Sequence, residues 1–373
     1  MLLISFMLLI ASSWPSKVLS FHSTASALRR SNNNIIRLFS SSVKKVVFLG
    51  TPECAVESLE LLYQASKASV DESKFEISAV VTQPPAPAGR KKILTPSPVH
   101  IFTESHPDIQ LFYPEKAKDV DFLASLKEMQ PDLCITAAYG NFLPTKFLEI
   151  PQFGTINIHP SLLPKYRGAA PVQRCLENGD AESGVSVVFT VLKMDAGPII
   201  RQEVVKLNGN EKADSFLSDM FKKGTEVLIE TLPSVWDGSV EVTEQDDDDA
   251  TPANKLSQED SRVDLATMSA SEIHNKCRGY AIWPGIWTTL KVGEEEEPKK
   301  VKIISTRLLE SSSEKTQVVK ELKEGKKSIL KLVCEDGSVL GVTQLQIPGK
   351  NVVDAKSFIN GLRGQSLSWT SPP

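Results

Sequence analysis

The stretch Gly154–Pro171 reads GTINIHPSLLPKYRGAAP, and the rest of the chain is best interpreted outward from it. Its first residues alternate as in a buried strand, so the side chains of Asn157 and His159 share one face. Pro160 ends that strand because proline has no N–H to donate. Ligands of open α/β sheets bind at the carboxyl ends of strands, where an amide beside an imidazole can stabilise a developing oxyanion. The pattern favours a reactive site here, and a hydrogen-bonded core histidine is the alternative that it leaves open.

Strand and helix patterns alternate along the chain on both sides of this stretch. A buried strand at Val46–Gly50 leads into a helix that begins near Pro52. The same alternation continues with strands at 75–82, 109–112 and 132–139, helices near 98–105 and 119–129, strands at 184–192 and 199–207, and a helix at 213–232. We therefore expect an α/β fold with a doubly wound, mostly parallel sheet covered on both faces. The first turn lacks G-x-G-x-x-G, so nothing here supports a dinucleotide cofactor.

The residues at the centre of the chain also resemble a known family. NIHPSLLP, residues 157–164, is similar to the active-site strand and loop of the 10-formyltetrahydrofolate-dependent formyltransferases. KYRGAAP, residues 165–171, resembles the methionyl-tRNA formyltransferase branch of that family. Pro160 stands where this branch usually carries glycine, a change expected to stiffen the loop without removing a catalytic group. The resemblance covers about residues 44 to 365.

The resemblance implies a set of site residues. Asp195, in the sequence M-D-A-G, matches the L-D-T-G loop of the family and joins Asn157 and His159 as the expected catalytic residues. A turn aspartate can instead simply cap backbone amides. The family's folate-binding loop falls on four consecutive residues, Ser161, Leu162, Leu163 and Pro164. The donor, 10-formyltetrahydrofolate, would be a substrate, and no metal is required.

A long proline-rich loop, residues 83–98, carries Arg90, Lys91 and Lys92 at its centre. Loops of this length are uncommon unless they are functional or disordered, and three adjacent cations can grip phosphate. A solvated charge run is the simpler alternative. The loop resembles the insertion that contacts the acceptor arm of the initiator tRNA in this family, with Arg90 on the matching arginine. Ala86 replaces the family's earlier arginine.

The composition of the chain changes after residue 240. Residues 241–249 read EVTEQDDDD, an acidic run that we expect to act as an exposed linker, extending to residue 254. Residues 255–373 hold 18 Lys and Arg against 15 Asp and Glu, whereas the whole chain has a net charge of −4. Strand patterns at 288–292, 300–305, 328–334 and 338–346 predict a small β-barrel. It resembles the family's oligonucleotide-binding-type domain, with Arg278-Gly279-Tyr280 and a helix after Pro348-Gly349-Lys350 as matching pieces. The lysine-rich run near 320–327 and Glu294–Glu297 read as solvated loops.

Residues 1–42 have the composition of a targeting segment rather than of a fold. No Asp or Glu precedes Glu53, while basic residues lie among many serines. The first fourteen residues are apolar but too short for a comfortable membrane span. A mitochondrial presequence is the reading we favour, and a two-part plastid address is the alternative. Five scattered cysteines without a C-x-x-C pair argue against a zinc site and against a disulfide framework.

The resemblance implies transfer of a formyl group from 10-formyltetrahydrofolate to the amine of methionyl-initiator tRNA, for translation initiation in an organelle. The partners would be that tRNA and the folate, and the mature form would be a monomer without membrane contact. Two alternatives remain. One is a formyltransferase acting on a small amine, which would need neither the basic loop nor the barrel. The other is a catalytically silent RNA-binding protein, which would not need Asn157, His159 and Asp195.

Overall fold

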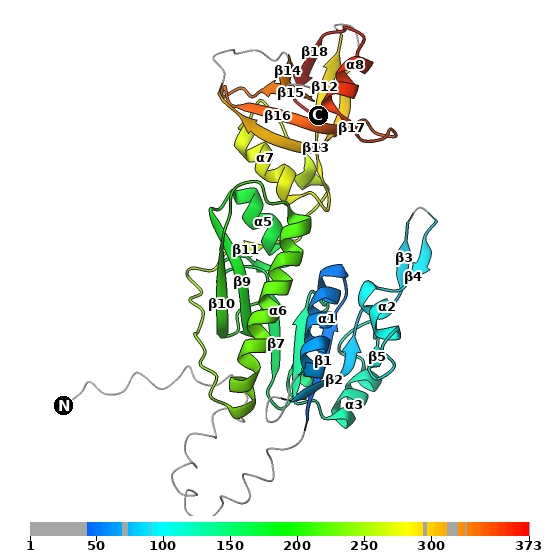
Figure 1. Ribbon diagram of the computed structural model, residues 1–373, viewed down its shortest axis with the longest axis vertical. Helices are drawn as coiled ribbons and strands as arrows, with labels where there is room; N and C mark the ends of the chain where they lie inside the picture. The colour runs from blue at the N-terminus through cyan, green and yellow to red at the C-terminus, as the bar shows by residue number, and fades with distance from the viewer. Residues whose placement is uncertain are drawn as a thin grey trace, which may run out of the picture.

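The computed structural model of the chain describes residues 43–68, 74–89, 91–293, 297–311, 320–324 and 327–372. These residues build an α/β domain around one seven-stranded sheet and a second domain around an antiparallel sheet (Figure 1). The expected targeting segment and Arg90 of the basic loop lie outside the described residues. Within those ranges, no helix is both long enough and apolar enough to cross a membrane.

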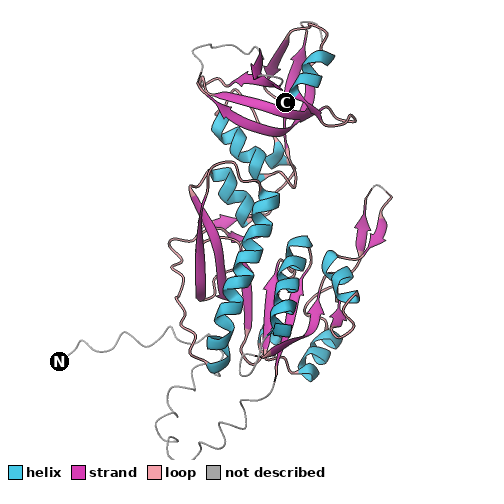
Figure 2. Ribbon diagram, viewed as in Figure 1, coloured by secondary structure: helices cyan, strands magenta, loops and turns pink. Residues whose placement is uncertain are grey.

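Five parallel strands make up most of the first sheet, and two further strands extend one edge by antiparallel pairing (Figure 2). In spatial order they are β10 (Ile199–Lys206), β9 (Glu182–Phe189), β7 (Thr155–His159), β6 (Leu133–Ala137), β1 (Lys44–Gly50), β2 (Phe75–Val81) and β5 (Gln110–Phe112). The chain runs outward from β1 to β5 on one side and from β6 to β7 on the other. The winding therefore reverses between β1 and β6, which is where open α/β sheets bind ligands. The expected doubly wound, mostly parallel sheet is confirmed.

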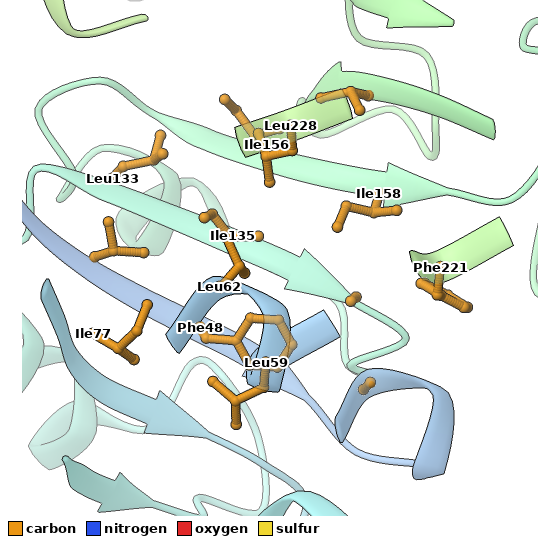
Figure 3. Close-up of a cluster of buried hydrophobic side chains, with 14 of the residues drawn as sticks. Phe48, Leu59, Leu62, Ile77, Leu133, Ile135, Ile156, Ile158, Phe221 and Leu228 are labelled. Carbon is orange, nitrogen blue, oxygen red and sulfur yellow. The ribbon is translucent and has the colours of Figure 1, made fainter. Parts of the chain in front are cut away.

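Helices cover both faces of this sheet because the apolar strands expose side chains to both sides. On β1, Phe48 faces a core formed with α1 (Glu53–Ala68) and α6 (Ala213–Asp237), whereas Val47 and Leu49 face α3 (Val120–Met129). Figure 3 shows the first of these cores, to which β7 contributes Ile156 and Ile158. Full burial of each such side chain contributes about 1.5–3 kcal/mol. The side chains of β7 that alternate with these isoleucines point away from this core. Three shorter helices complete the domain: α2 (Pro98–Glu104), α4 (Thr145–Leu148) and α5 (Pro171–Asn178).

Helix α6 is longer than expected from the sequence. It continues through Pro233 to Asp237, although a helix ending at Leu232 was predicted. Proline removes one backbone hydrogen bond, but Leu232 and Val235 are buried on either side of it and their packing holds the last turn in place. Gly238, with a φ of 74°, then ends the helix in the left-handed conformation.

The basic segment expected as a loop forms a short hairpin instead. Strands β3 (Ala86–Ala88) and β4 (Ile93–Thr95) pair antiparallel, and the hairpin projects from the body of the domain near α2 (Figure 1). Lys91 and Lys92 lie exposed at its turn, where the N–H of Lys92 donates to the carbonyl of Gly89. The predicted loop thus contains a hairpin that was not expected, because each strand is too short to be recognised without its partner.

The second domain contains all four strands expected from the sequence, and its barrel-type architecture is confirmed. Its strands are β12 (Ile286–Val292), β13 (Lys299–Leu309), β14 (Lys320–Glu324), β15 (Lys327–Val333), β16 (Val339–Gln346), β17 (Val353–Asp354) and β18 (Leu367–Thr370), around a core that includes Tyr280 and Trp369. The lysine-rich run interpreted as a loop is β14, which pairs with β15. Helix α8 (Ala355–Gly361) is the expected final helix, whereas α7 (Ala270–Gly279), which packs on α5, was not expected.

Candidate active site

Strand β7 presents two polar side chains at the carboxyl edge of the sheet. Ile156 and Ile158 enter the core, so the alternation of the strand directs Asn157 and His159 to the opposite face. His159 is 4% exposed, and Asn157 is half-buried. Buried polar groups need hydrogen-bond partners, and those partners decide which atoms of each side chain can meet a ligand.

The amide of Asn157 is oriented by a neighbouring strand. Thr136 of β6 lies directly opposite it in the register, and its hydroxyl donates to Oδ1 of Asn157 at 2.7 Å. With the amide oxygen engaged, the amide nitrogen is the group that Asn157 can offer to a ligand. The sequence carries a signal for this pair, since both residues lie at the polar ends of neighbouring strands, but only the register shows that they meet.

The ring of His159 lies between a backbone carbonyl and a carboxylate. Its Nε2 is 2.9 Å from the carbonyl oxygen of Tyr166, which can only accept, so Nε2 carries a proton and donates it. Its Nδ1 is 3.8 Å from Oδ1 of Asp195. A second proton on Nδ1 would make the ring an imidazolium facing this carboxylate, with an N–H available to a developing oxyanion.

Asp195 lies in the turn between β9 and β10 and is held by the loop that follows β7. Its Oδ2 accepts a hydrogen bond of 2.8 Å from the N–H of Gly168. Its backbone has a φ of 48°, in the left-handed region that non-glycine residues seldom adopt. The structure thus brings Asp195 beside His159 although 36 positions separate them in the sequence.

The four residues predicted to bind folate form a tight loop directly after β7. The hydroxyl of Ser161 is turned inward and donates to the carbonyl of Lys165 at 2.7 Å. Leu163 is also buried, and its N–H donates to the hydroxyl of Ser186 at 3.0 Å. Leu162 and Pro164 are half-buried, so these two side chains have exposed surface that can contact a ligand. Lys91 and Lys92 lie elsewhere, on the β3–β4 hairpin.

Tyr166 supports the site and was not singled out from the sequence. Its backbone φ is 63°, its N–H donates to Oγ1 of Thr251 at 2.9 Å, and its hydroxyl donates to Asp180 at 2.7 Å. Burial raises the pKa of its phenol, and the bond to Asp180 adds to that effect. Held at both ends, Tyr166 keeps the carbonyl that anchors His159 in a fixed position.

Three loops meet at the point where the winding of the sheet reverses. The carbonyl of Tyr139, after β6, accepts from the hydroxyl of Thr51 at 2.9 Å and from the side-chain amide of Gln83 at 3.2 Å. Thr51 follows β1 and Gln83 follows β2. The loops at the carboxyl ends of these strands are therefore tied together beside Asn157 and His159, where they can wall a ligand.

No three His, Cys, Asp or Glu side chains gather as a metal site in the part of the chain that the structure describes. All five cysteines are buried and unpaired. Burial raises the pKa of the Cys54, Cys175 and Cys334 thiols to about 11 each, so at neutral pH they are protonated packing groups rather than nucleophiles.

Comparison with known proteins agrees with this geometry. Residues 44–232 match the family described as Formyl transferase, and residues 255–363 match Formyl transferase, C-terminal domain. The methionyl-tRNA formyltransferase of Macrococcus caseolyticus is 35% identical over 323 residues, which cover 87% of this chain and 97% of the relative. That of Listeria innocua is 36% identical over 327 residues, covering 88% and 98%. The chain belongs to the methionyl-tRNA formyltransferase family.

A solved structure has the same fold as this member of the methionyl-tRNA formyltransferase family. An N-formyltransferase from Helicobacter canadensis, in complex with folinic acid and dTDP-3-aminofucose, superposes with a TM-score of 0.56 at 17% identity. The match covers 81% of this chain and 99% of that one. The likeness to an enzyme with an amino-sugar ligand concerns the fold alone, whereas the sequence relatives identify the branch.

Proposed function

We propose that this chain transfers the formyl group of 10-formyltetrahydrofolate to the α-amine of methionyl-initiator tRNA. The observation that carries the proposal is the convergence of Asn157, His159 and Asp195 at the carboxyl edge of the sheet in a chain of this family. The two alternatives explain less of the molecule. A formyltransferase for small amines would not need the barrel domain, and a silent RNA-binding protein would not need this site.

The site residues suit acyl transfer to an amine. The amine nitrogen bonds to the formyl carbon, and the bond from that carbon to N10 breaks, so N10 takes up a proton and the amine loses one. Negative charge develops on the formyl oxygen, where the amide nitrogen of Asn157 and the Nδ1–H of a protonated His159 can donate. Loss of one such donor typically costs about 3–4 kcal/mol of transition-state stabilisation. Asp195 stabilises the imidazolium and takes part in removing the amine proton.

The folate is proposed to bind where the winding of the sheet reverses, between the loop of Tyr139 and Gly140 and the loop Ser161–Pro164. Residues 44–240 would form the catalytic unit, residues 241–254 the linker, and residues 255–373 the tRNA-binding unit. Arg90, together with Lys91 and Lys92 of the β3–β4 hairpin, would contact the acceptor arm of the tRNA.

The reaction can be tested directly. Residues 44–373 are incubated with methionyl-tRNA and formyltetrahydrofolate, and the charged tRNA is separated on an acid gel. We expect formyl-methionyl-tRNA to form, and Asn157→Ala and His159→Ala each to lower the rate at least about a hundredfold. Glu128→Ala, on the exposed face of α3, serves as the control. Formylation of a small amine but not of the tRNA would contradict the proposal.

Asp195→Asn separates catalysis from binding. Asparagine tolerates the left-handed backbone of this position but cannot stabilise an imidazolium. We expect turnover to fall about as much as in the Asn157→Ala and His159→Ala variants, while folate affinity, measured by fluorescence titration, stays unchanged. A marked loss of folate affinity would mean that Asp195 is structural.

We also propose that residues 1–42 direct the protein to the mitochondrion and that the mature protein is a monomer. The support is the basic, serine-rich composition of that segment without acidic residues. A fusion of residues 1–42 to a fluorescent protein should enter mitochondria, and entry into plastids would contradict this. Light scattering on residues 44–373 should give the mass of one chain.

A further inference from the structure

The acidic segment between the two domains reaches the active site. Residues 241–249 are exposed apart from Gln245, whose side chain contacts both loops that carry the site. We propose that Gln245 is a positioning residue, which holds Asp195 in the orientation that faces His159. This inference rests on the proposed function.

All the hydrogen-bonding capacity of the Gln245 amide is used. Its Nε2 donates to the carbonyls of Asp195 at 2.9 Å and Gly197 at 2.7 Å. Its Oε1 accepts from Nε and Nη2 of Arg167 at 3.0 and 2.9 Å. An amide has two N–H donors and two acceptor lone pairs, so these four bonds saturate it. Its neighbours Glu244 and Asp246 carry carboxylates, which could not donate to two carbonyls.

These bonds close a ring around the catalytic carboxylate. Gln245 joins the backbone of Asp195 to the side chain of Arg167, and the next residue, Gly168, donates its N–H to the carboxylate of Asp195 at 2.8 Å. The left-handed backbone of Asp195 is a conformation that non-glycine residues seldom adopt and that persists where surrounding contacts over-determine it. Gln245 supplies such contacts from a part of the chain 50 positions away.

The same segment continues along the loop that anchors His159. Thr251 accepts from the N–H of Tyr166, and Ala253 pairs with Gly168 where β11 (Pro252–Ala253) lies parallel to β8 (Arg167–Gly168). A few residues further on, Leu256 enters the core of the barrel domain. The connection between the domains is thus a strap fixed across the site, with Gln245 at its contact with Asp195.

Removing the amide should affect turnover more than binding, since a displacement of about 1 Å in a catalytic group can cost on the order of a hundredfold in rate. Gln245→Met keeps the length of the side chain without hydrogen bonds, and Gln245→Glu keeps the acceptors for Arg167 without the donors. We expect both to lower kcat at least about tenfold, with KM for either substrate within about threefold of wild type. Asp248→Asn, an exposed change in the same segment, should leave kcat unchanged.

A double-mutant cycle distinguishes positioning from general support. If Gln245 acts through Asp195, Gln245→Met should lower kcat by a much smaller factor in a protein that already carries Asp195→Asn than in the wild type. Additive losses, a loss of kcat that follows a fall in Tm, or an unchanged kcat would each overturn the inference. Formylation of methionyl-tRNA by the wild-type protein is measured in the same series. An inactive wild type would contradict the proposed function, whereas an active wild type with unchanged kcat in the Gln245 variants would contradict only the role of Gln245.

Discussion

At the scale of single residues, the site depends on which atom of each polar side chain is already engaged. The hydroxyl of Thr136 donates a hydrogen bond to the amide oxygen of Asn157, and the carbonyl of Tyr166 accepts one from Nε2 of His159. What remains, the amide nitrogen of Asn157 and Nδ1 of His159, is what a formyl oxygen would meet. Orientation is therefore established before a substrate binds, which is the condition under which such donors are most effective.

Thr136→Val tests this orientation. The change removes the donor to Oδ1 of Asn157, so the amide can rotate and present its oxygen instead of its nitrogen. We expect kcat to fall about tenfold with little change in KM, and the free energy of unfolding to fall by about 0.5–1.5 kcal/mol because one hydrogen bond is removed. Thr136→Ser keeps the hydroxyl and should remain close to wild type. Equal activity in the valine and serine variants would show that the orientation of the amide is set elsewhere.

At the scale of elements, strand β7 is positioned by close contact with helix α6. Gly224 of α6 faces the sheet, where a Cβ would lie 2.5 Å from Cγ2 of both Ile158 and Val185. Ile158 lies between Asn157 and His159 in the sequence, so the packing of the helix and the alignment of the site are linked through one strand.

Gly224→Ala should therefore affect both stability and activity. The added methyl group forces the helix and sheet apart, and overpacking of this kind costs about 1–3 kcal/mol. We expect urea unfolding to show that loss, with a lower kcat as β7 shifts. Glu226→Ala, on the exposed side of the same helix, is the matched control. A Gly224→Ala variant with unchanged stability would contradict the contact.

The β3–β4 hairpin should act by charge. A cation that binds a phosphate releases counterions, so removing one such cation makes the slope of log K against log salt shallower by up to about 0.9. Changing Arg90, Lys91 and Lys92 to Ala should weaken tRNA binding and flatten the slope by roughly two to three units, with folate binding unaffected.

A control with the same change in charge is available at the amino ends of the strands, the opposite edge of the sheet from the hairpin, which follows β2. Lys67 and Lys127, in the last turns of α1 and α3, and Lys74, just before β2, are exposed there, and changing all three to Ala should leave the slope nearly unchanged. An unchanged slope in the hairpin variant would mean that the hairpin is only a solvated projection.

At the scale of the whole molecule, the two domains meet at a buried histidine. His274 of α7 donates from Nε2 to the carbonyl of Gly209 in the α/β domain at 3.1 Å and accepts at Nδ1 from Thr306 of β13 at 2.8 Å. Burial lowers the pKa of His274 below its usual value, and the nearby charge of Arg278 lowers it further. The folded protein therefore keeps this residue neutral where the unfolded chain would protonate it.

The thermal stability of the protein should consequently depend on pH through His274. Below about pH 6.5 the unfolded state binds a proton that the folded state does not, so stability falls as the pH drops and levels off below the folded pKa. His274→Gln can make the same two hydrogen bonds without titrating, and we expect it to reduce the loss of Tm between pH 7.5 and 5.5. Parallel Tm curves for the variant and wild type would contradict this assignment.

Much of the fold is readable from local pattern. The strands at Val46–Gly50 and Thr155–His159, the order of elements and the four barrel strands follow from apolar periodicity, which each segment carries by itself. Helix α7 was missed although its start carries a capping box, Ser269 with Glu272, because its pattern was weak beside the expected barrel. The strand β14 and the β3–β4 hairpin were missed because pairing depends on a second strand.

The sequence alone determined the α/β fold, the barrel and which residues could form the site; the tertiary structure decided how those residues are held. Tyr166 and Gln245 show no local pattern that would mark them, and the sequence does not show that Thr136 meets Asn157, since each of the three acts on a residue from another element. Gln245 is 50 positions from Asp195 and 78 from Arg167. Such contacts exist only after the sheet has formed and the interdomain segment has packed across it, because packing, and not proximity along the chain, brings their atoms together.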